Sequence, residues 1–148
     1  MSTAAVGALD RLLAVTVLLG RDMAEGLAAQ GLTVARATLL WHIRERGPST
    51  QRALADALGV SPRNVTGLVD GLVDGGLVTR EPHPTDRRAT LVSFTDRGAR
   101  LVDEFGAGRT ELAGQLFGGL APDRLECLVA GLDEVLGGLR ALVPGVAS

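Results

Sequence analysis

The segment from Ser61 to Gly75 constrains the fold of this chain more than any other stretch of its sequence. Serine is a favoured helix N-cap, and Pro62 suits a first helical position because it has no amide hydrogen to leave unpaired. Apolar residues then recur at the spacing of a single helical face: Val65, Leu68, Val69, Leu72 and Val73. The segment therefore predicts an amphipathic helix that buries this face.

A shorter helix is predicted just before it, over Gln51–Leu58, with Ser49 or Thr50 as its N-cap. Gly59 can adopt the positive φ that a tight corner between two helices requires. Small or apolar residues stand where two helices crossing at a sharp angle would share a core: Leu54, Ala55, Leu58, Val60, Val65 and Leu68. This spacing indicates a helix-turn-helix, and the alternative is an ordinary helical hairpin within a bundle.

Two runs rich in β-branched residues follow, Leu77–Arg80 and Ala89–Phe94, and they bracket the loop EPHPTDRR. They predict a β-hairpin with a long, basic tip. A helix-turn-helix followed by such a hairpin forms a winged helix, so the hairpin favours this interpretation over a helical bundle.

From Ser61 to Gly98 the sequence resembles the recognition helix and wing of the MarR family of bacterial transcriptional regulators. Asp86 and Arg88 match the Asp-x-Arg step of the family's wing, and Thr95 and Gly98 match the Thr-x-x-Gly that opens its next helix. The resemblance implies a mainly α fold with a small β-hairpin wing, in which a winged helix-turn-helix is flanked by N- and C-terminal dimerisation helices.

The candidate DNA-binding residues lie outside the apolar stripe of the recognition helix and at the wing tip. On the helix they are Ser61, Arg63, Asn64, Thr66 and Gly67, and on the wing they are Arg87 and Arg88. Arginine and asparagine can bond the edges of guanine and adenine, and the resemblance implies that Arg88 enters the minor groove. The family often has basic residues where this chain has Gly67 and Gly71, so more phosphate contact is expected from the wing and Arg63.

Three further residues are expected to support the wing rather than to bind DNA: Asp86, Asp70 and Arg80. A carboxylate on a helix that approaches DNA cannot hold phosphate, so Asp70 is expected to pair with Arg80 or Arg88 and fix the angle of the wing. Asp86 is expected to hold the loop that aims Arg88.

The formal net charge of −2 argues against nucleic-acid binding until its distribution is considered. Residues 36–100 carry ten arginines against seven acidic residues, a net charge of +3, whereas residues 101–148 carry −4 and residues 1–35 carry −1. The basic charge is therefore concentrated in the predicted winged helix. All 15 basic residues are arginine, whose planar fork suits phosphate and guanine.

Four more helices are expected around this unit: Ala5–Gln30, Val34–Arg46, Asp96 to about Leu116, and Pro122 to about Val143. The first has apolar residues on more than one side, so several neighbours must bury it. In the third, Gly106 and Gly108 each cost about 1 kcal/mol relative to alanine, and we expect a kink or an interruption there.

The last helix carries a heptad seam, formed by Leu125, Leu128, Leu132, Val135, Leu139 and Leu142. Such a seam requires a partner helix, either in its own chain or in a second copy. We favour a homodimer built from both termini, as the MarR resemblance implies.

Chemistry beyond DNA binding has little support in the sequence. No nucleophile elbow, phosphate-binding glycine loop or metal-ligand spacing is present, so we expect no enzyme, no cofactor and no metal site. Cys127, the single cysteine, is interpreted as a plain small side chain rather than a redox sensor. His83 is interpreted as a solvated wing residue that could add charge near phosphate.

An effector pocket is a weaker prediction, centred on Trp41 and His42. It would lie between the first, second and fifth helices, where relatives in the family bind aromatic acids. The alternative is that His42 is simply exposed or satisfied by hydrogen bonds.

The sequence therefore predicts one domain, residues 1–148, divided into a dimerisation helix (1–33), a winged-helix lobe (34–98) and C-terminal dimerisation helices (99–148). Its expected partners are double-stranded DNA, a second copy of itself and a small aromatic or amphipathic effector. We expect a repressor that binds a pseudo-palindromic operator. It is expected to be cytoplasmic, because the apolar run Leu12–Leu19 is too short to span a membrane. The alternative function is a winged helix that docks a protein without sequence-specific DNA binding.

Overall fold

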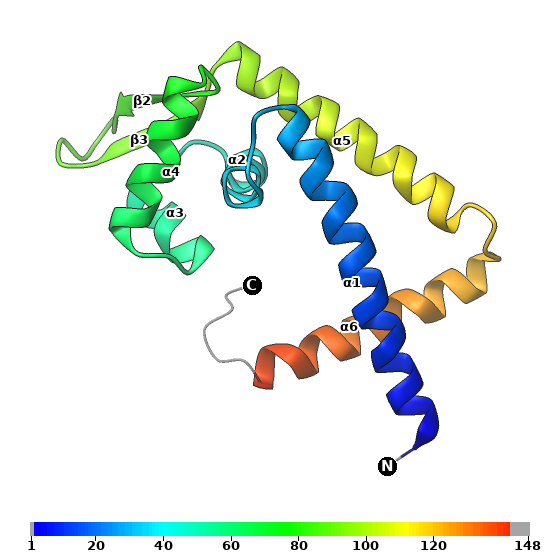
Figure 1. The fold of residues 1–148 in the computed structure, drawn as a ribbon. Coiled ribbons are helices and arrows are strands. Elements are labelled where there is room, and N and C mark those ends of the chain that lie inside the picture. The colour runs from blue at the N-terminus through cyan, green and yellow to red at the C-terminus, as the bar shows by residue number, and fades with distance from the viewer. Residues whose placement is uncertain (1, 143–148) are drawn as a thin grey trace.

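The computed structural model describes residues 2–142, which form a mainly helical protein with one small antiparallel sheet (Figure 1). In chain order the elements are α1 (Thr3–Ala29), α2 (Val34–Arg46), β1 (Ser49–Thr50), α3 (Gln51–Leu58), α4 (Pro62–Asp74), β2 (Val78–Pro82), β3 (Thr90–Phe94), α5 (Asp96–Phe117) and α6 (Pro122–Leu142). The predicted fold class is confirmed. The expected end of the last helix at Val143 lies outside the described residues.

The two helices of the helix-turn-helix begin where their capping residues predict, whereas α1 begins at Thr3, capped by Ser2, and not at Ala5. The Ser61 hydroxyl accepts a hydrogen bond from the Asn64 amide at 3.1 Å, and the Thr50 hydroxyl accepts one from the Ala53 amide at 3.1 Å. Between these two helices Gly59 adopts φ of 65°, the left-handed conformation expected at the corner. The helix-turn-helix is therefore fixed by local chemistry that can be read from the sequence.

The hydrophobic core lies where α2, α3, α4 and the sheet meet. The predicted apolar face of α4 is buried through Val65, Val69 and Leu72, and Leu68 and Val73 pack partly buried beside it. The largest fully buried side chains are Leu39, Leu40, Ile43, Leu54, Leu72, Val65, Val69, Val78, Val92 and Val102. All of them come from α2 through the start of α5, so the winged-helix lobe has its own core.

The sheet has the strand order β1-β3-β2, with both pairings antiparallel. The predicted hairpin is present, with Val78 opposite Phe94 and Pro82 opposite Thr90. Strand β1 was not predicted, because two residues are too few for an alternating pattern. It adds Ser49 opposite Val92 and thereby ties the start of the helix-turn-helix to the wing.

Helix α5 runs without interruption from Asp96 to Phe117, so the interruption predicted as one possibility at Gly106 and Gly108 is wrong. Both positions have open space where a side chain would be. A cost of about 1 kcal/mol per glycine does not break a helix whose first turns are anchored to the core.

Helix α1 extends away from the winged-helix lobe, and α6 runs across α1 in the same view (Figure 1). Leu27 is the only buried residue of α1, so the predicted burial of that helix by several neighbours is wrong within a single chain. By length and composition alone, the whole of α1 is long and apolar enough to cross a membrane, which the shorter run Leu12–Leu19 is not. The predicted seam of α6 is equally uncovered, with Leu128, Leu132, Val135 and Leu139 between 36 and 51% exposed.

Candidate nucleic-acid interface

The first turn of α4 presents polar side chains to solvent. Arg63 and Asn64 are exposed, and neither side chain makes a hydrogen bond or an ion pair with any residue from 2 to 142. Ser61 caps the helix with its hydroxyl. Because Pro62 and the Ser61 cap fix the backbone here, the two free side chains project from a defined position and can meet a ligand.

Two other residues predicted on this face differ in what surrounds them. The Thr66 hydroxyl donates to the Pro62 carbonyl at 2.9 Å and accepts from the Gln51 side-chain amide at 3.1 Å. Gly67 is exposed and has open space at the position of a side chain. Thr66 therefore links α4 to α3, while Gly67 lets another molecule approach the helix backbone closely.

Asp70 and Arg80 form the ion pair expected between α4 and the wing, with Arg80 Nη2 and Asp70 Oδ1 2.5 Å apart. Of the two arginines considered from the sequence, the structure therefore selects Arg80 and not Arg88. Arg80 Nε also donates to Gln51 Oε1 at 2.9 Å. The set Asp70, Arg80, Gln51 and Thr66 thus joins α4, β2 and α3, and it is called the wing-helix network below.

Gln51 was not predicted as part of this site, although its side chain bridges Thr66 and Arg80. As the first residue of α3 it follows the cap Thr50 and belongs to no apolar stripe. Nothing in the spacing of the sequence brings it near Arg80, which is 29 residues later.

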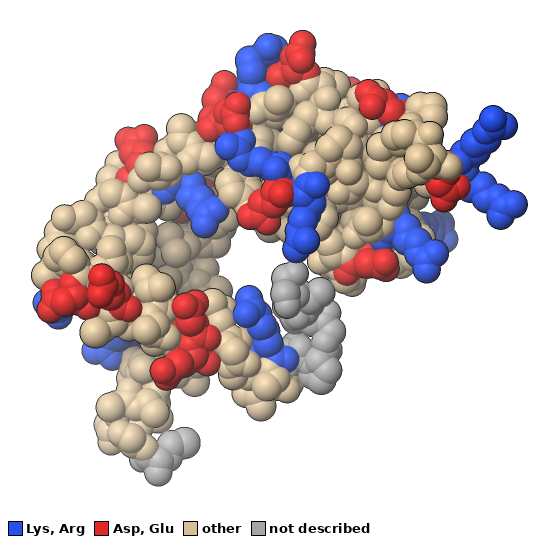
Figure 2. All heavy atoms as spheres, turned by 180° about the vertical axis from the view of Figure 1, so that it is seen from behind, with Lys and Arg blue, Asp and Glu red and all other residues tan. Residues whose placement is uncertain are grey.

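The wing tip is organised around Asp86. Its carboxylate accepts a hydrogen bond from the Arg88 amide at 3.0 Å, and its carbonyl accepts one from the Ala89 amide at 3.1 Å. Asp86 therefore holds the loop that carries Arg88, as predicted. Arg87 and Arg88 are exposed and make no ion pair within the described range, and basic side chains project from this end of the molecule (Figure 2).

His83 was expected to be a solvated residue, but its ring makes hydrogen bonds within the wing loop. It is half buried at the base of the wing loop, and its Nδ1 accepts hydrogen bonds from the amides of Thr85 at 3.2 Å and Asp86 at 3.1 Å. The sequence gives no direct signal of this contact, because it depends on the turn that the loop adopts.

The Thr-x-x-Gly motif fastens the wing to α5. The Thr95 hydroxyl donates to the Gly76 carbonyl at 2.6 Å and accepts from the Gly98 amide at 3.1 Å. At Gly98 a Cβ atom would overlap the carbonyl oxygen of Leu77 and lie 2.9 Å from its carbonyl carbon. The motif therefore needs both residues, since α5 lies directly against the backbone that leads into β2.

The space beside Gly71 is filled by another element. The guanidinium of Arg36, from the first turn of α2, occupies the position that a side chain at Gly71 would take. The positively charged guanidinium of Arg36 therefore lies against α4 at Gly71. Gly67 and Gly71 are the two positions of this helix where a basic side chain is missing.

The predicted effector pocket is only partly as expected. Trp41 lines an open pocket of about 520 Å³ between α2 and α5, together with Arg44, Asp103, Gly106, Ala107, Arg109, Thr110 and Ala113. Helix α1 contributes no lining residue, and His42 is half buried outside the pocket. The expected position between three helices and the role of His42 are therefore corrected, because α1 leaves this part of α2 uncovered.

Two arginines flank the Trp41 ring, with the guanidinium carbon of Arg44 at 5.8 Å and that of Arg109 at 5.3 Å from its centroid. Arg44 also pairs with Asp103, and the Trp41 indole nitrogen donates to Glu45 at 2.9 Å. Within residues 2–142 Arg109 makes no ion pair. The pocket thus combines an aromatic face with one uncompensated cation.

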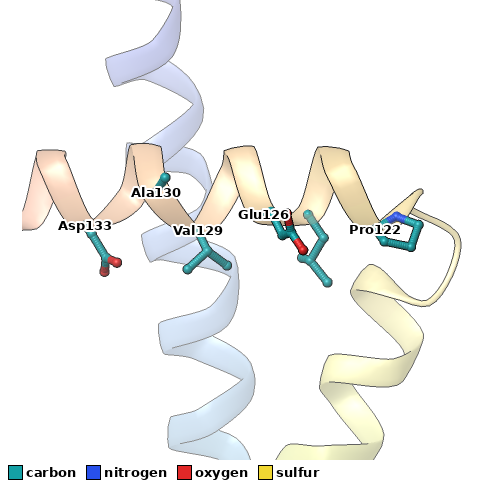
Figure 3. A pocket seen from close by; sticks show the side chains of 6 residues that line it. Pro122, Glu126, Val129, Ala130 and Asp133 are labelled. Atoms are coloured by element: carbon teal, nitrogen blue, oxygen red, sulfur yellow. The ribbon is translucent and has the colours of Figure 1, made fainter.

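Another hollow lies on α6, lined by Pro122, Leu125, Glu126, Val129, Ala130 and Asp133 (Figure 3). Every one of these residues comes from the same helix. It is therefore an uncovered apolar strip rather than an enclosed ligand site, and Cys127 is exposed on the same helix.

Comparison with known proteins agrees with this geometry. The model of the MarR family matches residues 30–89. An uncharacterised helix-turn-helix transcriptional regulator of Mycobacterium leprae, ML2140, is 32% identical over 105 residues, covering 71% of this chain and 73% of its own. The transcriptional repressor NicR of Pseudomonas putida is 38% identical over 72 residues, covering 49% of this chain and 46% of its own.

Among solved structures, RV1404 from Mycobacterium tuberculosis superposes with a TM-score of 0.75 at 29% identity, covering 93% of this chain and 95% of its own. The similarity thus extends over the flanking helices as well as the winged-helix lobe. This chain belongs to the MarR family.

Proposed function

We propose that this protein is a cytoplasmic transcriptional repressor that binds a pseudo-palindromic DNA operator as a homodimer and responds to a small ligand. The observation that carries the proposal is a set of exposed polar side chains without a partner in residues 2–142, namely Arg63 and Asn64 on α4 and Arg87 and Arg88 on the wing. The wing-helix network holds the two elements that bear them in a fixed relation. The relative NicR is named a transcriptional repressor, which supports repression rather than activation.

In this proposal α4 enters the major groove and the wing enters the adjacent minor groove. Arg63 and Asn64 bond base edges, where arginine suits guanine and asparagine suits adenine. Arg88, together with Arg87, senses the width and the negative potential of the minor groove. Two copies related by a two-fold axis then bind half-sites about one helical turn apart.

The dimer is proposed from the apolar surface that a single chain leaves uncovered. Large apolar side chains are exposed along α1 and α6: Val6, Leu9, Leu13, Val15, Val17, Leu18 and Met23 on α1, and Leu128, Val129, Leu132, Val135, Leu136, Leu139 and Leu142 on α6. A soluble monomer rarely exposes so large an apolar surface. The proposed partner is a second copy, which also gives α1 a role other than crossing a membrane.

The effector is proposed to be a small aromatic carboxylate bound between α2 and α5. The Trp41 ring supplies an apolar face, and Arg109 supplies a cation without a carboxylate partner in residues 2–142. A planar anion would stack on the ring and pair with that guanidinium, and charge-assisted hydrogen bonds of this kind are among the stronger ones.

Benzoate should quench the fluorescence of Trp41, the only tryptophan in the chain, and Arg109→Ala should weaken its binding by about tenfold. Arg100→Ala is the matched control, since Arg100 is exposed on the same helix and does not line the pocket. Equal effects of the two substitutions, or no quenching by benzoate at millimolar concentration, would refute this pocket assignment.

The DNA-binding proposal is tested by titrating a selected operator and a scrambled duplex at two salt concentrations. Arg63→Ala and Asn64→Ala should each cost about 1 to 3 kcal/mol on the operator and much less on the scrambled duplex, because a bidentate base contact has no counterpart there. Arg88→Ala should weaken binding to both duplexes and reduce the salt slope by about one contact.

Arg124→Ala serves as the control in these titrations, because Arg124 is exposed on α6, far from the wing (Figure 1). Equal losses on both duplexes for Arg63→Ala and Asn64→Ala would contradict base readout by α4. The competing function, a winged helix that docks a protein, predicts no steep salt dependence of DNA binding for any variant.

A further inference from the structure

The loop between β2 and β3 is built on the imidazole of His83. Nδ1 of that ring accepts hydrogen bonds from the amides of Thr85 at 3.2 Å and Asp86 at 3.1 Å, and the Thr85 hydroxyl lies 3.3 Å from the same nitrogen. The His83 amide donates in turn to the Ala89 carbonyl at 3.1 Å, which closes the base of the loop. His83 is half buried, whereas the residues from Pro84 to Arg88 are exposed.

A continuous series of hydrogen bonds runs from this imidazole to the arginines of the wing tip. His83 fixes the amide of Asp86, and the Asp86 carboxylate fixes the amide of Arg88 at 3.0 Å. The Asp86 carbonyl holds the Ala89 amide at 3.1 Å. The backbone that carries Arg87 and Arg88 is thus held by Asp86, whose own amide is bonded to the ring nitrogen of His83.

We propose that His83 is a positioning residue for DNA binding: its neutral imidazole holds the wing tip in the shape that presents Arg87 and Arg88, and protonation of Nδ1 releases that shape. The inference rests on the proposed function, because it concerns how the wing meets DNA. It assigns to the wing a dependence on pH that the arginines alone would not have.

The chemistry of the ring gives the sign of this dependence. An Nδ1 that accepts from two amides must keep its lone pair, so the proton of the neutral ring lies on Nε2. Protonation turns Nδ1 into a donor that faces two other donors, and both hydrogen bonds are lost. The loop should therefore loosen on acidification.

Charge alone predicts the opposite result. The charged groups nearest to His83 in the chain are Glu81 of β2, and Asp86, Arg87 and Arg88 of the loop itself. From α4, which packs against β2, the charged group facing the sheet is Asp70, and it is already paired with Arg80. A histidine that merely added positive charge beside phosphates would tighten DNA binding on acidification. The two accounts are therefore separated by the sign of the pH effect.

The first arm of the test uses the protein without DNA. In nitrogen-15 spectra at pH 8, the His83 ring should be the Nε2–H tautomer, and the amides of Thr85 and Asp86 should be protected from hydrogen exchange. Both amides should lose protection as the ring titrates. Amides that keep their protection across the titration would overturn the inference, whatever the protein does with DNA.

The second arm titrates a mixed-sequence duplex between pH 8 and about pH 5.5, using His42→Gln as the background so that His83 is the one histidine left. Affinity should fall by about 3- to 10-fold on acidification, as expected for two lost hydrogen bonds. His83→Ala should show that loss at pH 8 and no further pH effect. His83→Asn should keep most of the affinity at every pH, because an asparagine oxygen can accept from amides two and three residues later.

Tighter binding at low pH, or His83→Ala equal to the parent at pH 8, would contradict a positioning role. If no variant binds the duplex at any pH, the proposed function fails, and the exchange measurement still decides whether His83 holds the loop.

Discussion

Gly98→Ala should lower the free energy of unfolding by about 3 kcal/mol, because the new methyl group would overlap the carbonyl oxygen of Leu77. That oxygen belongs to backbone and also accepts the Thr95 amide at 3.1 Å, so it cannot turn aside without breaking a hydrogen bond. The start of α5 must instead move away from the wing. Denaturant unfolding followed by circular dichroism measures the loss, and operator binding should weaken with it.

Gly108→Ala is the matched control on the same helix. Nothing lies within 4 Å of a Cβ atom at Gly108, and the residue is exposed. Alanine there should stabilise the protein by about 0.5 to 1 kcal/mol, since glycine is the poorer helix former. Equal stability changes for the two substitutions would mean that α5 does not lie against Leu77 as described.

Leu132→Asp should convert the homodimer to a monomer at micromolar concentration. Leu132 is central in the apolar seam of α6 and remains 36% exposed within one chain. A carboxylate buried there between two copies would lack a partner, and an unpaired buried charge costs several kcal/mol. Light scattering reports the mass, and circular dichroism should show the winged-helix lobe still folded, because its core contains no residue of α6.

Gly137→Asp controls for the added charge. Gly137 comes five residues after Leu132, so it lies about 140° around the helix, away from the seam, and it has open space around it. This variant should remain dimeric. A Leu132→Asp protein that stays dimeric, or a parent protein that is monomeric, would remove the basis for the proposed interface.

The parts of the fold that could be predicted from the sequence depend on interactions between near neighbours in the chain. Ser61 and Pro62 mark the start of α4, and Thr95 marks the start of α5, because a cap acts within a few residues. The buried face of α4 follows from its period, as Val65, Val69 and Leu72 show.

The parts that could not be predicted depend on residues brought together only by the fold. Gln51 reaches Arg80, and Arg36 fills the space beside Gly71, although no spacing in the sequence relates either pair. From the sequence, Asp70 could pair with Arg80 or Arg88. Only the folded position of the wing relative to α4 shows that the partner is Arg80.

The burial of α1 was misjudged for a different reason. Its apolar residues do predict neighbours, but the sequence does not say whether these belong to the same chain, and in a single chain Leu27 is its only buried residue. The effector pocket was misjudged in the same way, because α1 was expected to cover Trp41 and does not line the pocket.

The central claim is that two copies of this chain present two α4 helices and two wings to one DNA duplex. Selection of bound duplexes from a random library, followed by titration of the enriched sequence over a range of salt, tests it most directly. The account predicts an inverted repeat with half-sites about one helical turn apart, and an affinity that falls by about 0.9 log unit per log unit of salt for each phosphate contact. Failure to enrich any sequence, or enrichment of a single half-site bound by one chain, would contradict it.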